Sequence, residues 1–140
     1  MENLTLLKCV LVIDHTLPIG LATNTAAVLS LSVGKQFPHL IGRDLEDNSG
    51  VRRAGITTAP IPILRGEGEW LRNSREAMKA HESELLVFEL ISATRTTKSY
   101  EEYATKMRDT PIQELEYFGL ALCGPVKLVN KFTGSLPLFR

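Results

Sequence analysis

The fold is decided by two neighbouring segments, "LKCVLVID" (Leu7 to Asp14) and "LPIGLATNTAAVLS" (Leu17 to Ser30). The first is an apolar, β-branched run with little alternation, which is typical of a central strand buried on both faces. In the second, Pro18 and Gly20 mark a turn, and the residues from about Thr23 to Val33 are small or apolar nearly all round. We therefore expect a strand, a turn and a deeply buried helix.

The remaining chain alternates between strand and helix patterns, with polar loops rich in turn residues between them. No repeat, linker or low-complexity tract divides it. Strands that alternate with helices predict an α/β fold, here a three-layer α-β-α sandwich around a small mixed sheet of about four strands. The predicted elements are a long loop over 35–55 with a short strand near His39 to Ile41, an edge strand over Ala59 to Leu64, a helix over Glu67 to Glu82, a strand over Leu85 to Leu90, a helix that begins at the capping box Ser99 to Glu102, a strand over Tyr117 to Cys123, and a last helix between Pro125 and Gly134.

The size and charge of the chain restrict its class. Its 140 residues, 44% of them hydrophobic, suffice for one ordinary core, so we expect a single domain over residues 1–140. Sixteen basic and sixteen acidic side chains cancel. No global field then draws the protein to nucleic acid or to an anionic membrane, which argues against RNA and membranes as partners.

The cellular compartment is predicted from the amino-terminal residues and the cysteines. Met1 to Asn3 lack the basic segment and the apolar run of a signal peptide, and no apolar run is long enough to cross a bilayer. Cys9 and Cys123 both lie within apolar runs, as buried thiols do in a reducing compartment. A cytoplasmic location is therefore expected.

Two blocks of the chain, taken together, carry a family resemblance. "KCVLVIDHTLPIGLATNTAAV" resembles the opening strand, loop and helix of the type 2 peptidyl-tRNA hydrolases, and "LALCGPVKLVNKFTGSLPLF" resembles their closing strand, Gly-Pro helix and tail. The middle segments "GITTAPIPIL" and "SYEEYATKM" are similar to a sister group of these hydrolases, a domain of unknown function on the same fold. The resemblance implies that fold for nearly the whole chain, and it implies a homodimer.

The catalytic residues of the hydrolases are not retained at the matching positions. Their lysine, glutamine and histidine in and after the turn into the first helix correspond to Thr23, Ala27 and Ser30 here. Ester hydrolysis builds negative charge on the carbonyl oxygen, and a threonine hydroxyl cannot replace an ammonium group there. Asp109-Thr110 lies near the place of the family's aspartate and threonine, but its spacing to Gly124-Pro125 does not match without a gap.

The junction after the first strand remains the best place for a site. Asp14, His15 and Thr16 end the strand where open α/β sheets have their binding crevice. Thr23 and Asn24 open the predicted helix, whose free backbone amides favour an anionic or polar group. The alternative is that Thr23 or Asn24 only caps the helix and that Asp14 only forms the turn.

Other side chains are weaker candidates. Thr57, before the edge strand, could line the same pocket. His15 could act as a general base, and Cys123, at a strand end before a helix, could be a nucleophile beside it. The alternative readings are a solvated loop histidine and a buried core thiol. Three dispersed histidines and two distant cysteines lack the spacing of a metal site, and we expect no cofactor.

Three functions follow from these patterns. The leading hypothesis is a scaffold that lacks the catalytic lysine and binds a small or nucleotide-like ligand at the turn into the first helix. The second is a diverged ester or amide hydrolase that uses His15 with Asp14 or Cys123. The third is a non-catalytic interaction module with an apolar surface near Trp70 or over Ala59 to Leu64. A cation such as Lys8 or Lys35 in the mouth of the pocket would count against the first.

Overall fold

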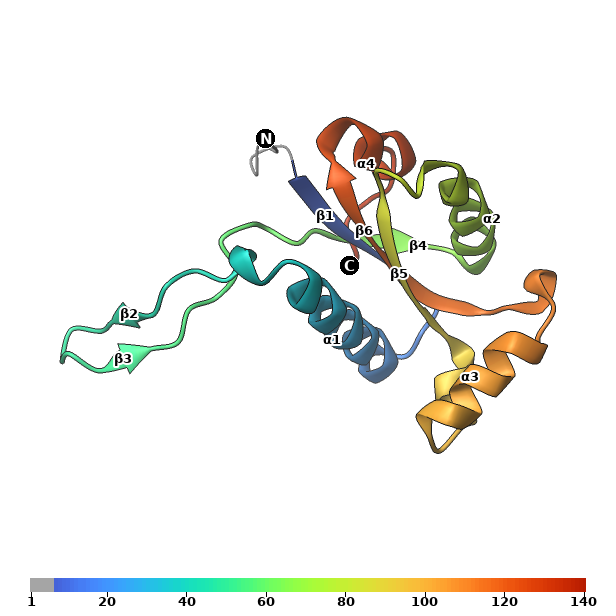
Figure 1. Ribbon diagram of the computed structural model, residues 1–140, viewed down its shortest axis with the longest axis horizontal. Helices are drawn as coiled ribbons and strands as arrows, with labels where there is room; N and C mark the ends of the chain where they lie inside the picture. The colour runs from blue at the N-terminus through green and yellow to red at the C-terminus, as the bar shows by residue number, and fades with distance from the viewer. Residues whose placement is uncertain (1–6) are drawn as a thin grey trace.

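The computed structural model of the protein describes residues 7–140. They form a mixed α/β fold in which a four-stranded sheet is covered by helices on both faces (Figure 1). The expectation from Met1 to Asn3 about a signal peptide lies outside the described residues. The elements are β1 (Leu7–Asp14), α1 (Ile19–Gln36), β2 (Leu45–Glu46), β3 (Arg52–Arg53), β4 (Ile63–Gly66), α2 (Gly68–Met78), β5 (Leu86–Ile91), α3 (Tyr100–Asp109), β6 (Tyr117–Pro125) and α4 (Val126–Thr133), with short 3-10 turns between some of them.

The main sheet has the strand order β4-β1-β6-β5. β1 lies parallel to β4 and antiparallel to β6, and β6 lies antiparallel to β5. β1 and β6 are therefore the central strands, and their side chains are buried almost without interruption. This agrees with the unbroken apolar runs in their sequences, because a strand covered on both faces has no solvent side.

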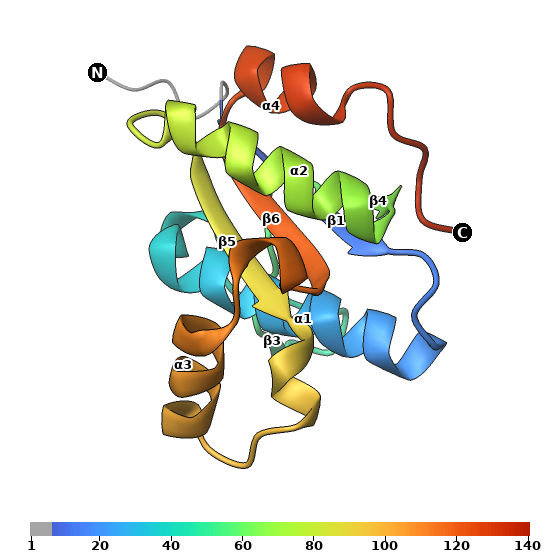
Figure 2. The ribbon, with the colours of Figure 1, turned by 90° about the vertical axis from the view of Figure 1, so that its right-hand side faces the viewer.

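Alternate residues of β1 enter two separate cores. Val10 and Val12 face the core that α2 and α4 cover, whereas Leu11 faces the core under α1. Figure 2 shows α2 and α4 on one side of the sheet and α1 on the other. Leu71 of α2 and Val129 of α4 are fully buried in the first core. The helices are thus held to the sheet by apolar burial, the main favourable term in folding.

The outer edge of β4 is covered by the tail, defined here as residues 136–139. The amide of Arg65 donates to the carbonyl of Pro137 at 2.8 Å, and the amide of Phe139 donates to the carbonyl of Ile63 at 2.9 Å. Leu64 and Leu138 form an antiparallel bridge. The tail therefore satisfies the backbone groups of an edge strand that would otherwise be open to pairing with other chains.

Residues 42–56 form a hairpin that projects from the body of the protein, and we call this segment the arm (Figure 1). Its strands β2 and β3 pair with each other in a sheet of their own. Asp47 closes the tip, because its carboxylate accepts hydrogen bonds from the amides of Ser49 and Val51. The arm continues the chain directly from the turn after α1 and returns it toward β4.

Several predicted elements are confirmed. The strand over Leu7–Asp14 has the predicted limits. The side chain of Ser99 accepts a hydrogen bond from the amide of Glu102 at 3.1 Å, so the capping box begins α3 as expected. β5 and β6 and the last helix lie within one or two residues of their predicted limits.

Other predictions need correction. α1 begins at Ile19 rather than near Thr23, because Pro18 is its N-cap and a proline at the start of a helix loses no hydrogen bond. The segment near His39 forms a 3-10 turn rather than a strand. The strand expected over Ala59 to Leu64 is at the edge as predicted, but it runs over Ile63–Gly66, beyond the prolines. α2 ends at Met78, short of Glu82.

Within residues 7–140, no helix combines the length and the apolar character needed to cross a membrane.

Candidate ligand-binding site at the carboxyl ends of β1 and β4

The site forms where the two parallel strands end side by side. Asp14 pairs with Gly66 at the last position of the β1–β4 register. The amide of His15 then donates to the carbonyl of Gly66 at 3.1 Å, which continues the pairing by one residue. Gly66 leaves room for the neighbouring strand, because a Cβ atom there would lie 2.6 Å from Cγ1 of Val12 in β1. Both chains leave the sheet at this point, one toward α1 and one toward α2.

His15 and Glu67 lie next to each other at this edge. Nε2 of His15 is 3.7 Å from Oε1 of Glu67. The distance allows an ion pair when the imidazole is protonated, but it is too long for a direct hydrogen bond. The His15 side chain is 25% exposed and that of Glu67 is 77% exposed. The imidazole is therefore sheltered by the protein, whereas the carboxylate faces solvent.

Glu67 also lines a cavity of about 230 Å³, and His15 is not among the residues that line it. Trp70 reaches it from α2 and is half-buried, with part of its side chain packed on the core. The tail closes the other side. The lining residues are Arg65, Gly66, Glu67, Trp70, Leu136 and Pro137. The cavity thus has one aromatic wall, an apolar floor from the tail, and one residue of each charge.

Asp14 and Thr16 are occupied with each other. The amide and the hydroxyl of Thr16 donate to Oδ1 of Asp14 at 2.9 and 2.7 Å. This is an Asx turn, in which an aspartate shapes the backbone that follows it. The turn fixes the direction in which His15 leaves the strand, so Asp14 and Thr16 support the site.

Thr23 and Asn24 do not cap α1. Both lie inside the helix, because it begins at Ile19. The hydroxyl of Thr23 donates to the carbonyls of Ile19 and Gly20 at 2.9 and 3.1 Å. This bonding to the preceding turn is common for threonine within helices, and it leaves the hydroxyl proton engaged. Both side chains are exposed on the outward face of α1.

Thr57 and Cys123 lie at the opposite end of the sheet from His15. Cys123 pairs with Cys9, near the start of β1, whereas His15 follows its end. Thr57 precedes β4 and bridges to Ile41 at the base of the arm, where its hydroxyl donates to the carbonyl of Ala59. The structure therefore does not bring either residue to His15.

The cations that could have restored charge to the turn into α1 are also elsewhere. The ammonium group of Lys8 donates to the side chain of Asn130 at 2.7 Å, near the start of β1. Lys35 lies in the last turn of α1, at the far end of the helix from the turn.

Comparison with known proteins places the chain in a family. Residues 7–140 match the family model described as "Protein of unknown function (DUF2000)". The chain belongs to the DUF2000 family. A solved structure of a protein of unknown function, Atu0240 from Agrobacterium tumefaciens str. C58, is similar at 18% identity with a TM-score of 0.87, over 96% of this chain and 98% of that one. At this identity the likeness concerns the fold. A search of curated proteins finds no match.

Sequence reasoning missed three residues of the site in this DUF2000 chain. The sequence predicts Glu67 as the start of a helix and places Trp70 on the apolar surface of an interaction module, and it assigns Arg65 to no site. Arg65 lies in β4, and Glu67 and Trp70 follow it. Glu67 comes near His15 only because β4 pairs with β1. No short pattern encodes this parallel pairing, so the sequence held no local signal that would have joined these residues to His15.

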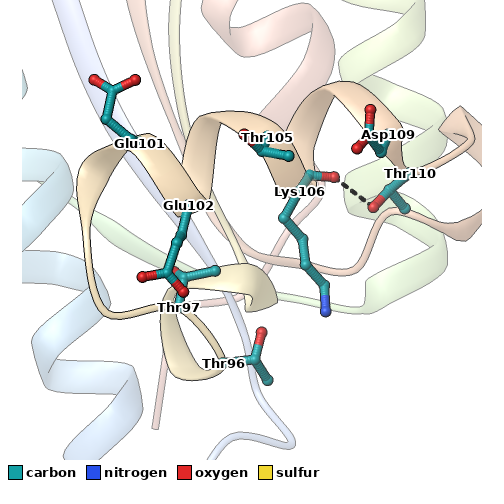
Figure 3. A pocket seen from close by; sticks show the side chains of 8 residues that line it. All are labelled: Thr96, Thr97, Glu101, Glu102, Thr105, Lys106, Asp109 and Thr110. Atoms are coloured by element: carbon teal, nitrogen blue, oxygen red, sulfur yellow. Dashed lines mark hydrogen bonds between the residues drawn. The ribbon is translucent and has the colours of Figure 1, made fainter.

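A larger cavity of about 560 Å³ lies over α3 of the DUF2000 fold, and Figure 3 shows its lining. The hydroxyls of Thr97 and Thr110 donate to carbonyls of their own turns, at 2.7 and 2.6 Å. No aromatic residue lines it. The lining residues are Thr96, Thr97, Glu101, Glu102, Thr105, Lys106, Asp109 and Thr110, all from α3 and adjacent turns. This is an open, acidic depression, and it lacks the mixed character of the His15 site.

A polar cluster lies between α2 and β5. Arg75 forms an ion pair with Glu89, and both side chains are about three-quarters covered. Burial, helped by the nearby Glu89, raises the pKa of Tyr117 to about 12. These partners satisfy one another, and neither cavity described above includes them. Among residues 7–140, no group of three or more acidic, histidine or cysteine side chains is arranged to hold a metal ion.

Proposed function

We propose that this DUF2000 domain binds a small or nucleotide-like ligand in the cavity lined by Trp70, Arg65 and Glu67. We also propose that its fold is the three-layer sandwich of the type 2 peptidyl-tRNA hydrolases. In this proposal the chain has lost the catalytic lysine of those enzymes. The observation that carries the binding proposal is the cavity lined by Trp70 and Glu67, because the carboxylate of Glu67 also lies 3.7 Å from the imidazole of His15. Open α/β sheets bind ligands in the crevice at the carboxyl ends of their strands, which favours the same edge.

The loss of the lysine supports binding over the ancestral reaction. Thr23 stands at the matching position, and its hydroxyl is already bonded to its own helix. Neither Lys8 nor Lys35 takes over the position. A tetrahedral oxyanion at the turn into α1 would therefore find no fixed positive side chain, and this contribution is typically worth several kcal/mol.

The cavity favours a small ligand with a planar part. Its volume of about 230 Å³ lies below the usual range for drug-sized ligands, which begins near ~300 Å³. Trp70 offers a flat apolar surface to a ring, and Arg65 supplies positive charge for an anionic group. A nucleoside monophosphate or a small aromatic carboxylate combines these two properties.

Binding is tested by calorimetric titration of the purified protein with adenosine monophosphate, uridine monophosphate and benzoate. We expect one of these to bind, and Trp70→Ala to weaken its binding about fivefold or more, because a stacked aromatic pair is worth about 1 kcal/mol or more. Trp70→Phe, which keeps an aromatic wall, should retain most of the affinity. Tyr100→Ala, far from the cavity, is the matched control. Equal affinity of wild type and Trp70→Ala for every ligand would refute the site.

A second candidate function is a diverged ester hydrolase, and the closeness of His15 to Glu67 favours it. Histidine is the side chain that most often acts as a general base, and a carboxylate beside it can orient the imidazole. His15 would activate a water molecule directly, and a covalent route is not favoured because no serine, cysteine or lysine lines the cavity next to Glu67. Turnover of a simple ester that His15→Asn and Glu67→Gln both abolish would establish this activity. If the protein instead releases tRNA from peptidyl-tRNA at an ordinary rate, the proposal that it has lost peptidyl-tRNA hydrolysis is wrong.

The third candidate, a non-catalytic module, receives no support near Trp70 or Ala59 to Leu64. Trp70 is half-buried and lines the cavity. The exposed apolar side chains lie mainly on α1 and on the arm instead. We also propose a cytoplasmic location, which the two unpaired buried thiols support.

A further inference from the structure

The arm exposes apolar side chains that its own chain does not cover. Leu45 and Val51 are 52% and 53% exposed, and Ile56 is 76% exposed. Leu45 lies opposite Arg53, and Asp47 lies opposite Val51, so Leu45 and Val51 share one face of the hairpin. No arm residue is among the described residues of either core. An isolated two-stranded hairpin is at best marginally stable in water, which indicates that the arm has a partner surface.

The arm is nevertheless a defined hairpin. The carboxylate of Asp47 accepts from Arg53 at 2.8 and 3.0 Å, in addition to the two tip amides. At the base, Gly55 approaches Gly42 so closely that a Cβ atom would lie 1.9 Å from its carbonyl oxygen. The shape is therefore set before any contact is made, and preorganisation lowers the entropic cost of binding.

The outward face of α1 is a second uncovered surface. Leu31 is 78% exposed and Val28 is 39% exposed, one turn apart. Thr23, Asn24 and Ala27 complete this face, and the helix carries no charged residue before Lys35. A solvent-facing helix surface is normally charged, so an uncharged exposed stripe of this length indicates a protein contact.

We propose that the protein forms a two-fold dimer in which the arm of each copy lies along the outward face of α1 of the other copy. In Figure 1 the arm runs away from the body on the side where α1 ends. In the proposed dimer, a two-fold axis passes near the base of the arm. Rotation about this axis places the second copy beside the arm, with its α1 against it. The same rotation returns the partner's arm to the first α1, so both surfaces of both copies are covered at once.

Charge and size support a second copy as the occupant. The chain has a net charge of zero, so two copies do not repel each other. The arm itself balances three basic against three acidic side chains, namely Arg43, Arg52, Arg53, Asp44, Glu46 and Asp47. A standard interface uses about 20–30 residues from each partner. Residues 42–56 together with the exposed side of α1 approach that size.

The dimer is tested by light scattering coupled to size exclusion on the full chain at tens of micromolar. We expect a dimer for the wild type. Leu31→Glu and Val51→Glu should each raise the dimer Kd about 100-fold, because each places an unpaired charge in the contact. Ile112→Glu, which puts the same charge on an exposed isoleucine away from both surfaces, should leave the dimer intact. Circular dichroism confirms that each variant is folded.

Cross-linking tests the arrangement of the two surfaces. Leu31→Cys and Val51→Cys chains are mixed and treated with a thiol-specific bismaleimide. Because Cys9 and Cys123 are buried, the native thiols should not react. We expect a covalent dimer in the mixture, and much less with either variant alone.

A monomeric wild type would overturn the proposal and leave another protein as the occupant of the arm. A dimer that survives both glutamate substitutions, or that Ile112→Glu disrupts equally, would also overturn it. The proposal does not depend on the ligand site. Trp70→Ala should leave the dimer unchanged, so failure of one proposal is distinguishable from failure of the other.

Discussion

Cys9 and Cys123 face each other across the central strands β1 and β6, at directly paired positions of the register. Both are buried as free thiols in the core under α1. The hydrogen bond with Cys9, together with burial, raises the pKa of the Cys123 thiol. A thiol needs to ionise to act as a nucleophile, so this environment makes Cys123 inert.

Alkylation tests this assignment directly. In the folded protein at neutral pH, iodoacetamide should modify neither cysteine, and in denaturant it should modify both, as measured by intact mass. Rapid modification of Cys123 in the folded state would contradict the assignment. It would also return Cys123 to the list of catalytic candidates.

Gly119 of β6 sets how closely α1 approaches the sheet. A Cβ atom there would lie 2.9 Å from Cγ2 of Thr25 and 3.0 Å from the carbonyl oxygen of Val12. Gly119→Ala should therefore destabilise the protein by about 1–3 kcal/mol, as overpacking does, in urea unfolding. Gly34→Ala is the control, since nothing lies within 4 Å of its added methyl group. That change should stabilise α1 by up to about 1 kcal/mol. Equal effects of the two substitutions would contradict the close packing of α1.

The stability of the turn at the tip of the arm should depend on pH through the carboxylate of Asp47. Hydrogen bonds from the amide of Val51, then from Ser49 and Arg53, lower its pKa from 3.8 to about 2. The stabilisation is therefore complete above about pH 4 and is lost as the pH falls through about 2. The amide shifts of Ser49 and Val51 in NMR spectra should follow this transition. Asp47→Asn should abolish it, and Glu46→Gln should leave it unchanged.

Loss of the phenolic proton of Tyr117 should lower the free energy of unfolding in strong base. Burial, assisted by Glu89, raises its pKa from 10.0 to about 12, so the unfolded chain loses this proton first. The stabilisation is present below pH 10 and is lost as the pH rises through about 12. Tyr117→Phe should flatten the fall in the free energy of unfolding between these values. Tyr100→Phe, at a tyrosine that is 83% exposed, should not.

Local sequence patterns sufficed for most of the fold. β1, the capping box at Ser99 and the burial of β6 depend on runs of a few residues, and each was predicted with nearly correct limits. The start of α1 was missed because Pro18 and Gly20 are as typical of a turn as of a first helical turn. The sequence predicts a loop over 35–55 in place of the arm, because β2 and β3 are only two residues each, too short for an alternating pattern to appear.

The candidate site was predicted only in part. Its location after β1 and the presence of His15 were predicted from local order along the chain. The approach of Glu67 and Trp70 depends on β4 lying beside β1, which is a non-local pairing that no short pattern encodes. Thr23 and Asn24 were assigned to the site on the assumption that they begin α1, and the earlier start of the helix moves them to its outward face.

The pairing of β1 with β6 also bears on how the protein folds. These central strands come from near the two ends of the described chain, with Leu7 opposite Pro125. Contacts between residues so distant in sequence form late, because the intervening chain must first be closed into a loop. During synthesis, the apolar residues of β1 leave the ribosome long before their partner strand exists. We expect slow refolding in the test tube and, in the cell, an early need for a chaperone that shields this strand.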